Sequence, residues 1–149
     1  MSALRSQGRR LALQTLYALE FPEPGGLVEI LNSAAPRAPQ EVKDFALEIV
    51  NGVATTRAQL DTAIDSALEH WRLERIHPVE RNILRIGLYE LNYRPDIPAH
   101  VILNEAVDLA RRFGDEEAWK LINGILDRLG KERLEGTASA GPESAASSS

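Results

Sequence analysis

The side chains that could carry out acid–base or metal chemistry are few and poorly spaced for it. The histidines are His70, His77 and His100, and no two of them have the i, i+4 spacing that puts two metal ligands on one helix face. Asp61 and Asp65 have that spacing, but on an amphipathic helix such a pair is usually solvated. The sequence contains no glycine-rich phosphate loop and no serine nucleophile motif. We therefore expect neither an enzyme nor a bound cofactor or metal.

Basic side chains are concentrated at the N-terminus. The first ten residues contain Arg5, Arg9 and Arg10 and no acid, which leaves 14 of the 17 basic residues against all 22 acidic ones in the rest of the chain. Arg5 and Arg9 would share one helix face, where each can contact phosphates. The alternative is an ordinary solvated N-terminal turn, although cations are unfavourable at that end of a helix. The net charge of −5 does not exclude nucleic acid, because phosphate binding needs only a local basic face.

A second candidate for RNA binding lies near the end of the helical region. Trp119 falls off the apolar stripe of its segment and is followed by Lys120. An exposed aromatic ring beside a cation can stack a base of single-stranded RNA. Packing of Trp119 against a neighbouring helix is the competing interpretation, and the sequence leaves both open.

The composition indicates a single cytoplasmic domain. The chain of 149 residues has no cysteine, so neither disulfides nor thiolate metal sites are available. No apolar run approaches the ~20 residues needed to span a bilayer, and the first ten residues lack the apolar core of a secretory signal. We expect a helical domain over residues 1–130 and a disordered tail over residues 131–149, which is rich in Gly, Ser and Ala.

Apolar residues recur at helical spacing almost throughout, and no strand-like alternation stands out. The pattern predicts an all-α bundle of about six or seven helices. They cover about residues 3–20, 27–33, 42–71, 78–93, 97–113 and 116–129. Gly52 suggests a bend within the long third segment, and Gly87 suggests close packing by another helix, because glycine inside a helix is otherwise costly.

Three segments resemble the NusB family and occur in that family's order. Residues 9–17 read RRLALQTLY, residues 79–91 read VERNILRIGLYEL, and the third segment combines DIP at 96–98, ILNEAVDLA at 102–110, FG at 113–114 and NGILD at 123–127. The last is similar to the family pattern D-I-P…I-N-E-A-V-E-L-A-K-x-F-G…F-V-N-G-V-L-D. The resemblance extends over residues ~3–130.

This resemblance implies a fold and a function. The fold is all-α with two packed helical subdomains. Members of the family act with NusE, which is also a small-subunit ribosomal protein, and the pair recognises the single-stranded boxA element of nascent RNA. The complex joins RNA polymerase and other Nus factors and suppresses premature termination, chiefly on ribosomal RNA operons. No catalysis and no cofactor are implied.

The resemblance also assigns roles to residues that match the family's motifs. The RNA-binding residues it implies are Arg5, Arg9, Arg10 and Lys120. Two departures affect this surface: Ser6, Gln7 and Gly8 interrupt a run that is often more basic, and Leu121 occupies a position that is commonly Phe. Trp119 is a candidate to replace that aromatic ring.

Tyr17, Phe21 and Glu80 match positions on the NusE-facing side of the family. Their structural alternatives are core packing for the two aromatic residues and a solvated first-turn acid for Glu80.

Two other functions compete with this interpretation. A homodimeric helical protein-interaction module without sequence-specific RNA binding would fit a bundle of this size. A NusB-like domain of a ribosomal RNA cytosine methyltransferase is disfavoured, because no glycine-rich cofactor loop follows the last helix.

Overall fold

The computed structural model describes residues 2–21, 26–69, 72–131 and 133, and within them the secondary structure is entirely helical. The elements are α1 (Ser2–Leu19), α2 (Leu27–Ala34), α3 (Gln40–Ala67), the short 3-10 helix η1 (Leu73–Arg75), α4 (Pro78–Tyr93), α5 (Ala99–Phe113) and α6 (Ala118–Leu129). The predicted all-α bundle is confirmed. None of the helices in the described part of the chain is long and apolar enough to cross a membrane.

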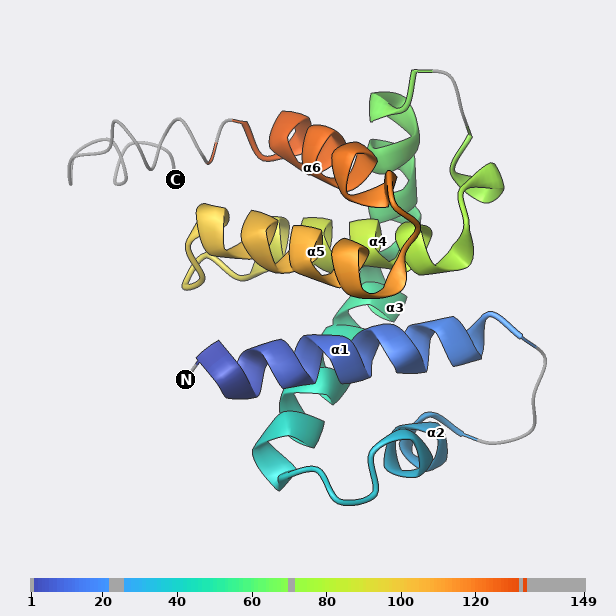
Figure 1. The fold of residues 1–149 in the computed structure, drawn as a ribbon, viewed down its shortest axis with the longest axis vertical. Helices are drawn as coiled ribbons and strands as arrows, with labels where there is room; N and C mark the ends of the chain where they lie inside the picture. The colour runs from blue at the N-terminus through green and yellow to red at the C-terminus, as the bar shows by residue number, and fades with distance from the viewer. Residues whose placement is uncertain (1, 22–25, 70–71, 132, 134–149) are drawn as a thin grey trace.

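The helices form two groups joined by the long helix α3 (Figure 1). α1 and α2 lie against one half of α3, while α4 and α6 pack against other parts of it, and α5 packs against both α4 and α6. α4 is the central helix, because its middle residues are buried almost without interruption from Asn82 to Leu91. The two packed subdomains expected from the sequence therefore share one continuous hydrophobic core.

Local sequence signals explain where the helices begin. Pro78 occupies the first turn of α4, where its missing N–H costs nothing, and the His77 Nδ1 atom accepts a hydrogen bond from the backbone N–H of Val79 at 3.2 Å. At the start of α2 the backbone N–H of Gly26 donates to the Glu29 carboxylate at 2.7 Å. These contacts satisfy backbone groups that the first turn of a helix leaves unpaired.

Gly52 and Gly87 mark close contacts between helices rather than bends. α3 is helical throughout, and a Cβ atom on Gly52 would lie 2.2 Å from the ring of Tyr89. A Cβ atom on Gly87 would lie 2.6 Å from Leu126 Cδ1, which confirms the packing expected at that position. Both glycines let a side chain of another helix approach the backbone directly.

The predicted domain boundary at residue 130 falls in a segment that still contacts the bundle. The Arg133 guanidinium donates hydrogen bonds to the backbone oxygen atoms of Leu91 at 3.0 Å and Arg94 at 3.2 Å, and to that of Ile97. Arg133 thus supplies donors and positive charge to the C-terminal end of α4, where the carbonyls carry partial negative charge. The predicted disorder of residues 134–149 lies outside the described residues.

Replacing Gly87 with alanine should lower the free energy of unfolding by about 1–3 kcal/mol, because the added methyl group overpacks against the fully buried Leu126 side chain. Gly124 is the matched control, since it also lies inside a helix but a Cβ atom there meets nothing within 4 Å. Gly124→Ala should raise stability by up to about 1 kcal/mol through helix propensity. Urea unfolding of the two variants measures the difference; equal stabilities would contradict the packing role of Gly87.

Candidate nucleic-acid and partner interface

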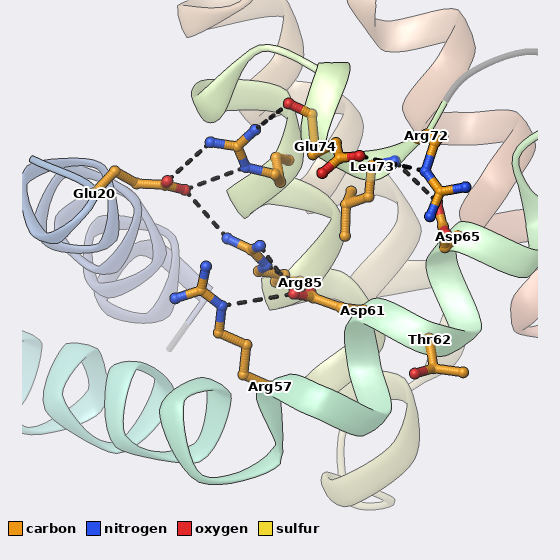
Figure 2. Close-up of a pocket in the computed structure, with 10 residues that line it drawn as sticks. Glu20, Arg57, Asp61, Thr62, Asp65, Arg72, Leu73, Glu74 and Arg85 are labelled. Carbon is orange, nitrogen blue, oxygen red and sulfur yellow. Dashed lines mark hydrogen bonds and ion pairs between the residues drawn. The ribbon is translucent and has the colours of Figure 1, made fainter.

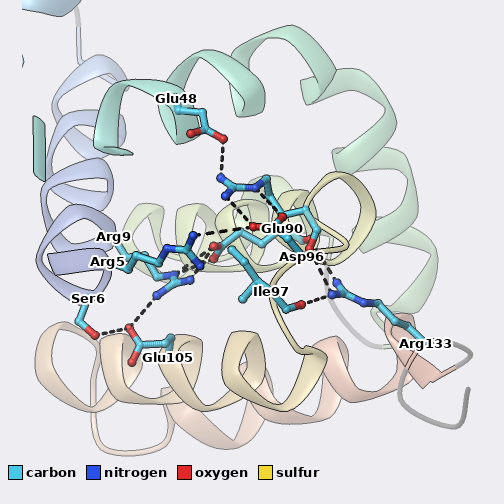
Figure 3. Close-up of polar contacts among 10 residues, drawn as sticks. Arg5, Ser6, Arg9, Glu48, Glu90, Asp96, Ile97, Glu105 and Arg133 are labelled. Atoms are coloured by element: carbon cyan, nitrogen blue, oxygen red, sulfur yellow. Dashed lines mark hydrogen bonds and ion pairs between the residues drawn. The ribbon is translucent and has the colours of Figure 1, made fainter. Parts of the chain in front are cut away.

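Arg9 is buried at the centre of the molecule, with only 2% of its side chain exposed. Its Nε and Nη2 atoms donate to the Glu90 carboxylate at 2.8–3.1 Å, and its Nη1 atom donates to Glu105 Oε1 at 3.1 Å (Figure 3). Burial lowers the pKa of Arg9, but the hydrogen bonds and charges of the two carboxylates outweigh it and raise that pKa. Arg9 therefore joins α1 to α4 and α5 and is not available to a phosphate, in contrast to the role that the sequence suggested.

Arg5 and Arg10 remain accessible on α1. The Arg5 Nη2 atom lies 3.8 Å from Asp96 Oδ2, too far for a hydrogen bond, and its guanidinium lies 5.6 Å from the centre of the Phe45 ring. Arg10 is half-buried and makes no hydrogen bond or ion pair with another described residue. These two arginines keep donors that a phosphate could use.

Packing explains why the basic run of α1 is interrupted. Gly8 is buried, and a Cβ atom there would lie 2.6 Å from Phe45 Cδ2. The Ser6 hydroxyl donates a hydrogen bond to Glu105 Oε1 at 2.7 Å, so this side chain belongs to the same buried network as Arg9. Gln7 is exposed. Larger basic residues at positions 6 and 8 would disturb contacts that hold α1 in place.

Trp119 and Lys120 lie in the first turn of α6. Trp119 is half-buried, and the Arg111 guanidinium lies 4.6 Å from its ring centre. The sequence had indicated only Lys120 as a cation beside this ring. The Lys120 Nζ atom lies 2.9 Å from Glu117 Oε1. α1 begins at one end of the bundle and α6 begins at the other, so the structure does not bring the two predicted RNA-binding groups together (Figure 1).

Tyr17 and Phe21 are exposed rather than packed in the core. They are 36% and 44% accessible, and their rings contact each other edge to face with centres 5.1 Å apart. Exposed aromatic side chains of this kind are common in protein interfaces. Both lie at the C-terminal end of α1, which is the end of the bundle where α4 and α6 begin (Figure 1).

Glu80, in the first turn of α4, faces the turn between α5 and α6. Burial and the negative charge of Asp115 raise the pKa of Glu80 above its ordinary value. Its neighbour Arg81 forms an ion pair with Glu20 at the end of α1, at 2.8 Å. The three residues predicted to face NusE, Tyr17, Phe21 and Glu80, therefore lie at the same end of the molecule.

A polar network beside this end was not predicted from the sequence. Arg85, only 4% exposed, forms a two-point ion pair with Asp61 at 2.7 and 3.0 Å and contacts Glu20 Oε2 at 3.2 Å (Figure 2). The network lines a pocket of about 500 Å³ between α1, α3, η1 and α4. Asp61 thus has a structural partner instead of facing only solvent, and the Asp65 carboxylate accepts the backbone N–H of Leu73 at 2.9 Å. The pairing was missed because Arg85 lies 24 residues from Asp61.

The residues considered for metal binding form no site in the described structure. No group of three or more histidine or carboxylate side chains converges there. His77 caps α4, and His70 lies outside the described residues.

Comparison with known proteins identifies the family. The NusB family model matches residues 6–131. The chain belongs to the NusB family. A curated relative, the transcription antitermination protein NusB of Myxococcus xanthus, is 45% identical over 132 residues, which cover 84% of this chain and 93% of the relative. The NusB of Sorangium cellulosum is also 45% identical, over 84% of this chain and 90% of the relative.

Solved structures of NusB proteins have the same fold. T. maritima NusB superposes with a TM-score of 0.78 at 35% identity, covering 86% of this chain and 91% of that one. A crystal structure of the antitermination factors NusB and NusE in complex with double-stranded RNA matches with a TM-score of 0.79 at 26% identity, covering 89% of this chain and 99% of that one.

Replacing Arg9 with alanine should cost about 3–5 kcal/mol of stability, because the Glu90 carboxylate would stay buried without its partner. Arg9→Lys keeps the charge but not the planar fork and should lose less. The double variant Arg9→Met/Glu90→Leu removes both charges and should recover most of the loss. Urea unfolding checks these values; an Arg9→Ala variant as stable as the parent would show that Arg9 does not hold the helices together.

The Glu20 network should make stability depend on pH. Burial raises the pKa of Glu20, but hydrogen bonds from Arg81 and Asn82 and the nearby positive charges lower it overall. A carboxyl with a lowered folded-state pKa stabilises the protein above its ordinary pKa of 4.5, and this contribution is lost as pH falls through the folded-state value. Glu20→Gln should therefore be less stable than the parent at pH 7, with the difference shrinking below pH ~4.5. A difference that is independent of pH would contradict the ionic role of Glu20.

Proposed function

We propose that this NusB-family protein is a transcription antitermination factor that binds boxA single-stranded RNA together with NusE. In this role it joins RNA polymerase and other Nus factors and helps the polymerase avoid premature termination, chiefly on ribosomal RNA operons. The observation that carries the proposal is the match of residues 6–131 to the NusB family, together with the likeness to a NusB–NusE–RNA complex.

The accessible cations support RNA binding at two places. Arg5 and Arg10 form the first patch and have guanidinium donors without hydrogen-bond partners among the described residues. Trp119 and Lys120 form the second, with Arg111 stacked on the Trp119 ring. Guanidinium and ammonium groups contact phosphates, and an aromatic ring with a guanidinium above it can extend a stack of bases.

The exposed pair Tyr17 and Phe21 supports a protein partner at the opposite end of α1 from Arg5. Partly exposed aromatic side chains contribute strongly to binding energy when a partner protein covers them, because they bury large apolar areas. Glu80 adds a carboxylate at the same end of the molecule, which would suit a basic residue of NusE.

Fluorescence anisotropy of a labelled boxA RNA, with and without the cognate NusE, tests this function. A scrambled RNA and two salt concentrations separate base recognition from general attraction to phosphates. Tighter and boxA-selective binding in the presence of NusE is the expected result. Absence of any boxA preference, with a change in oligomeric state instead, would favour a homodimeric protein-interaction module.

Arg10→Ala should weaken RNA binding and flatten its salt dependence, because each lost phosphate contact removes about 0.7 from the slope of log K against log salt for a single strand. Arg37→Ala is the matched control, since Arg37 is exposed in the turn between α2 and α3 and has no hydrogen bond or ion pair with another described residue. The same anisotropy titration reports both variants. Equal losses for the two would show that only net charge matters and that Arg10 is not a specific contact.

A further inference from the structure

A small hollow lies where the first turn of α1 meets the first turn of α3. Its walls are Leu4 and Arg5 from α1 and Glu41 and Phe45 from α3, and most of its lining is apolar. Its volume is about 480 Å³, within the ~300–1,000 Å³ range of small-molecule sites. The hollow adjoins Arg5, which is part of the surface proposed above for RNA.

The aromatic wall of the hollow is held firmly in place. The Phe45 ring packs against Gly8, and three guanidiniums surround it: Arg9 at 5.4 Å, Arg5 at 5.6 Å and Arg94 at 5.7 Å from the ring centre. Arg94 is fixed in turn by a two-point contact with Asp96 at 3.0 Å. The Phe45 wall of the hollow is therefore in place before a ligand arrives.

Two groups of opposite charge stand at the hollow without hydrogen-bond partners in the described part of the chain. Arg5 lies within ion-pair distance of Asp96, at 3.8 Å, but makes no hydrogen bond with a described residue, and Glu41 is exposed and makes no hydrogen bond or ion pair there. Glu41 lies in the first turn of α3. An ionised carboxylate can only accept hydrogen bonds, so a ligand must bring N–H or O–H groups to it and an anion to Arg5.

We propose that this hollow holds one unstacked guanine nucleotide of the bound RNA. This rests on the RNA-binding function proposed above. The base lies against Leu4 and Phe45, the Glu41 carboxylate accepts hydrogen bonds from its N1–H and 2-amino groups, and Arg5 contacts its phosphate. Single-stranded RNA is commonly recognised in this way, with bases splayed out and bonded along their Watson–Crick edges.

The carboxylate determines the choice of base. Guanine presents two adjacent N–H donors, which match the two oxygens of Glu41. Adenine and cytosine present one amino group beside an acceptor nitrogen, and uracil presents one N–H between two carbonyls, so each would bring a lone pair toward the carboxylate. Two-point pairing of this kind discriminates between bases more strongly than a single hydrogen bond.

The pairing of charges favours a nucleotide over a protein side chain. A basic residue of a partner would suit Glu41 but would be repelled by Arg5, and an acidic residue would meet the reverse conflict. A nucleotide carries an anion and N–H donors on one molecule and satisfies both groups. The hollow is also continuous with Arg5, which is already accessible for RNA.

Binding of free mononucleotides to the full chain tests the hollow directly. GMP, IMP and AMP are titrated while the backbone amide resonances of residues 4, 5, 41 and 45 are followed by NMR. IMP lacks the 2-amino group, so GMP should bind about fivefold more tightly than IMP, and AMP should bind most weakly. In Glu41→Gln the advantage of GMP over IMP should fall to about twofold or less, since a neutral amide accepts with one oxygen only.

The control variant is Asp127→Asn, which removes a carboxylate from an exposed position on α6 with no described partner and should keep the full GMP preference. Equal affinities of the parent protein for GMP and IMP would overturn the proposal. So would resonance shifts in these residues on addition of NusE but not of nucleotides, because the hollow would then be a protein contact.

A second titration separates this proposal from the RNA-binding function itself. RNAs in which each guanine of boxA is replaced in turn by inosine are compared by anisotropy in the parent and in Glu41→Gln. A loss of about fivefold at one position in the parent, absent in Glu41→Gln, supports the site. Tight boxA binding that no inosine weakens overturns the guanine site and leaves the antitermination function standing. GMP selectivity without boxA binding supports the hollow and contradicts the antitermination function.

Discussion

The buried ion pair between Arg9 and Glu90 is the contact on which the rest of the structure depends. Removing two charges from water is costly, and the cost is offset only because the guanidinium makes a two-point contact with Glu90 and a further hydrogen bond to Glu105. This geometry fixes α1 against α4 and α5 at a single register. The positions of Arg5, Arg10 and Phe45 follow from it, since all three lie on α1 or pack directly against it.

α1 also separates the functional surfaces. It has 18 residues, which at 1.5 Å per residue is a length of about 27 Å. The accessible arginines lie at its start, while the exposed pair Tyr17 and Phe21 lies toward its other end, at the end of the bundle where α4 and α6 begin. An RNA that contacted both Arg5 and Lys120 would have to extend over several nucleotides along the bundle. The proposed partner surface lies at the same end of the bundle as the second of these contacts.

Most of the fold could be predicted from the sequence, because helical periodicity, prolines and glycines act locally. The bounds of α1, α2 and α6 differ from prediction by one or two residues, and Gly87 contacts Leu126 as expected. Side-chain roles were harder to predict. Arg9 resembles Arg5 and Arg10 in the sequence, and only the position of Glu90, 81 residues away, makes it a core residue. The Arg85–Asp61 pair and the Arg111–Trp119 contact likewise depend on how the helices cross. Local sequence patterns do not predict helix crossing.

The contact between Gly8 and Phe45 limits how much positive charge the first helix can carry. Position 8 has no room for a side chain, position 9 is occupied by a buried cation, and Ser6 is bonded to Glu105. Among the residues that interrupt the basic run, Gln7 alone is exposed and makes no hydrogen bond to another described side chain. In this chain, therefore, only one of these positions can take an added positive charge without disturbing a contact that holds α1 in place.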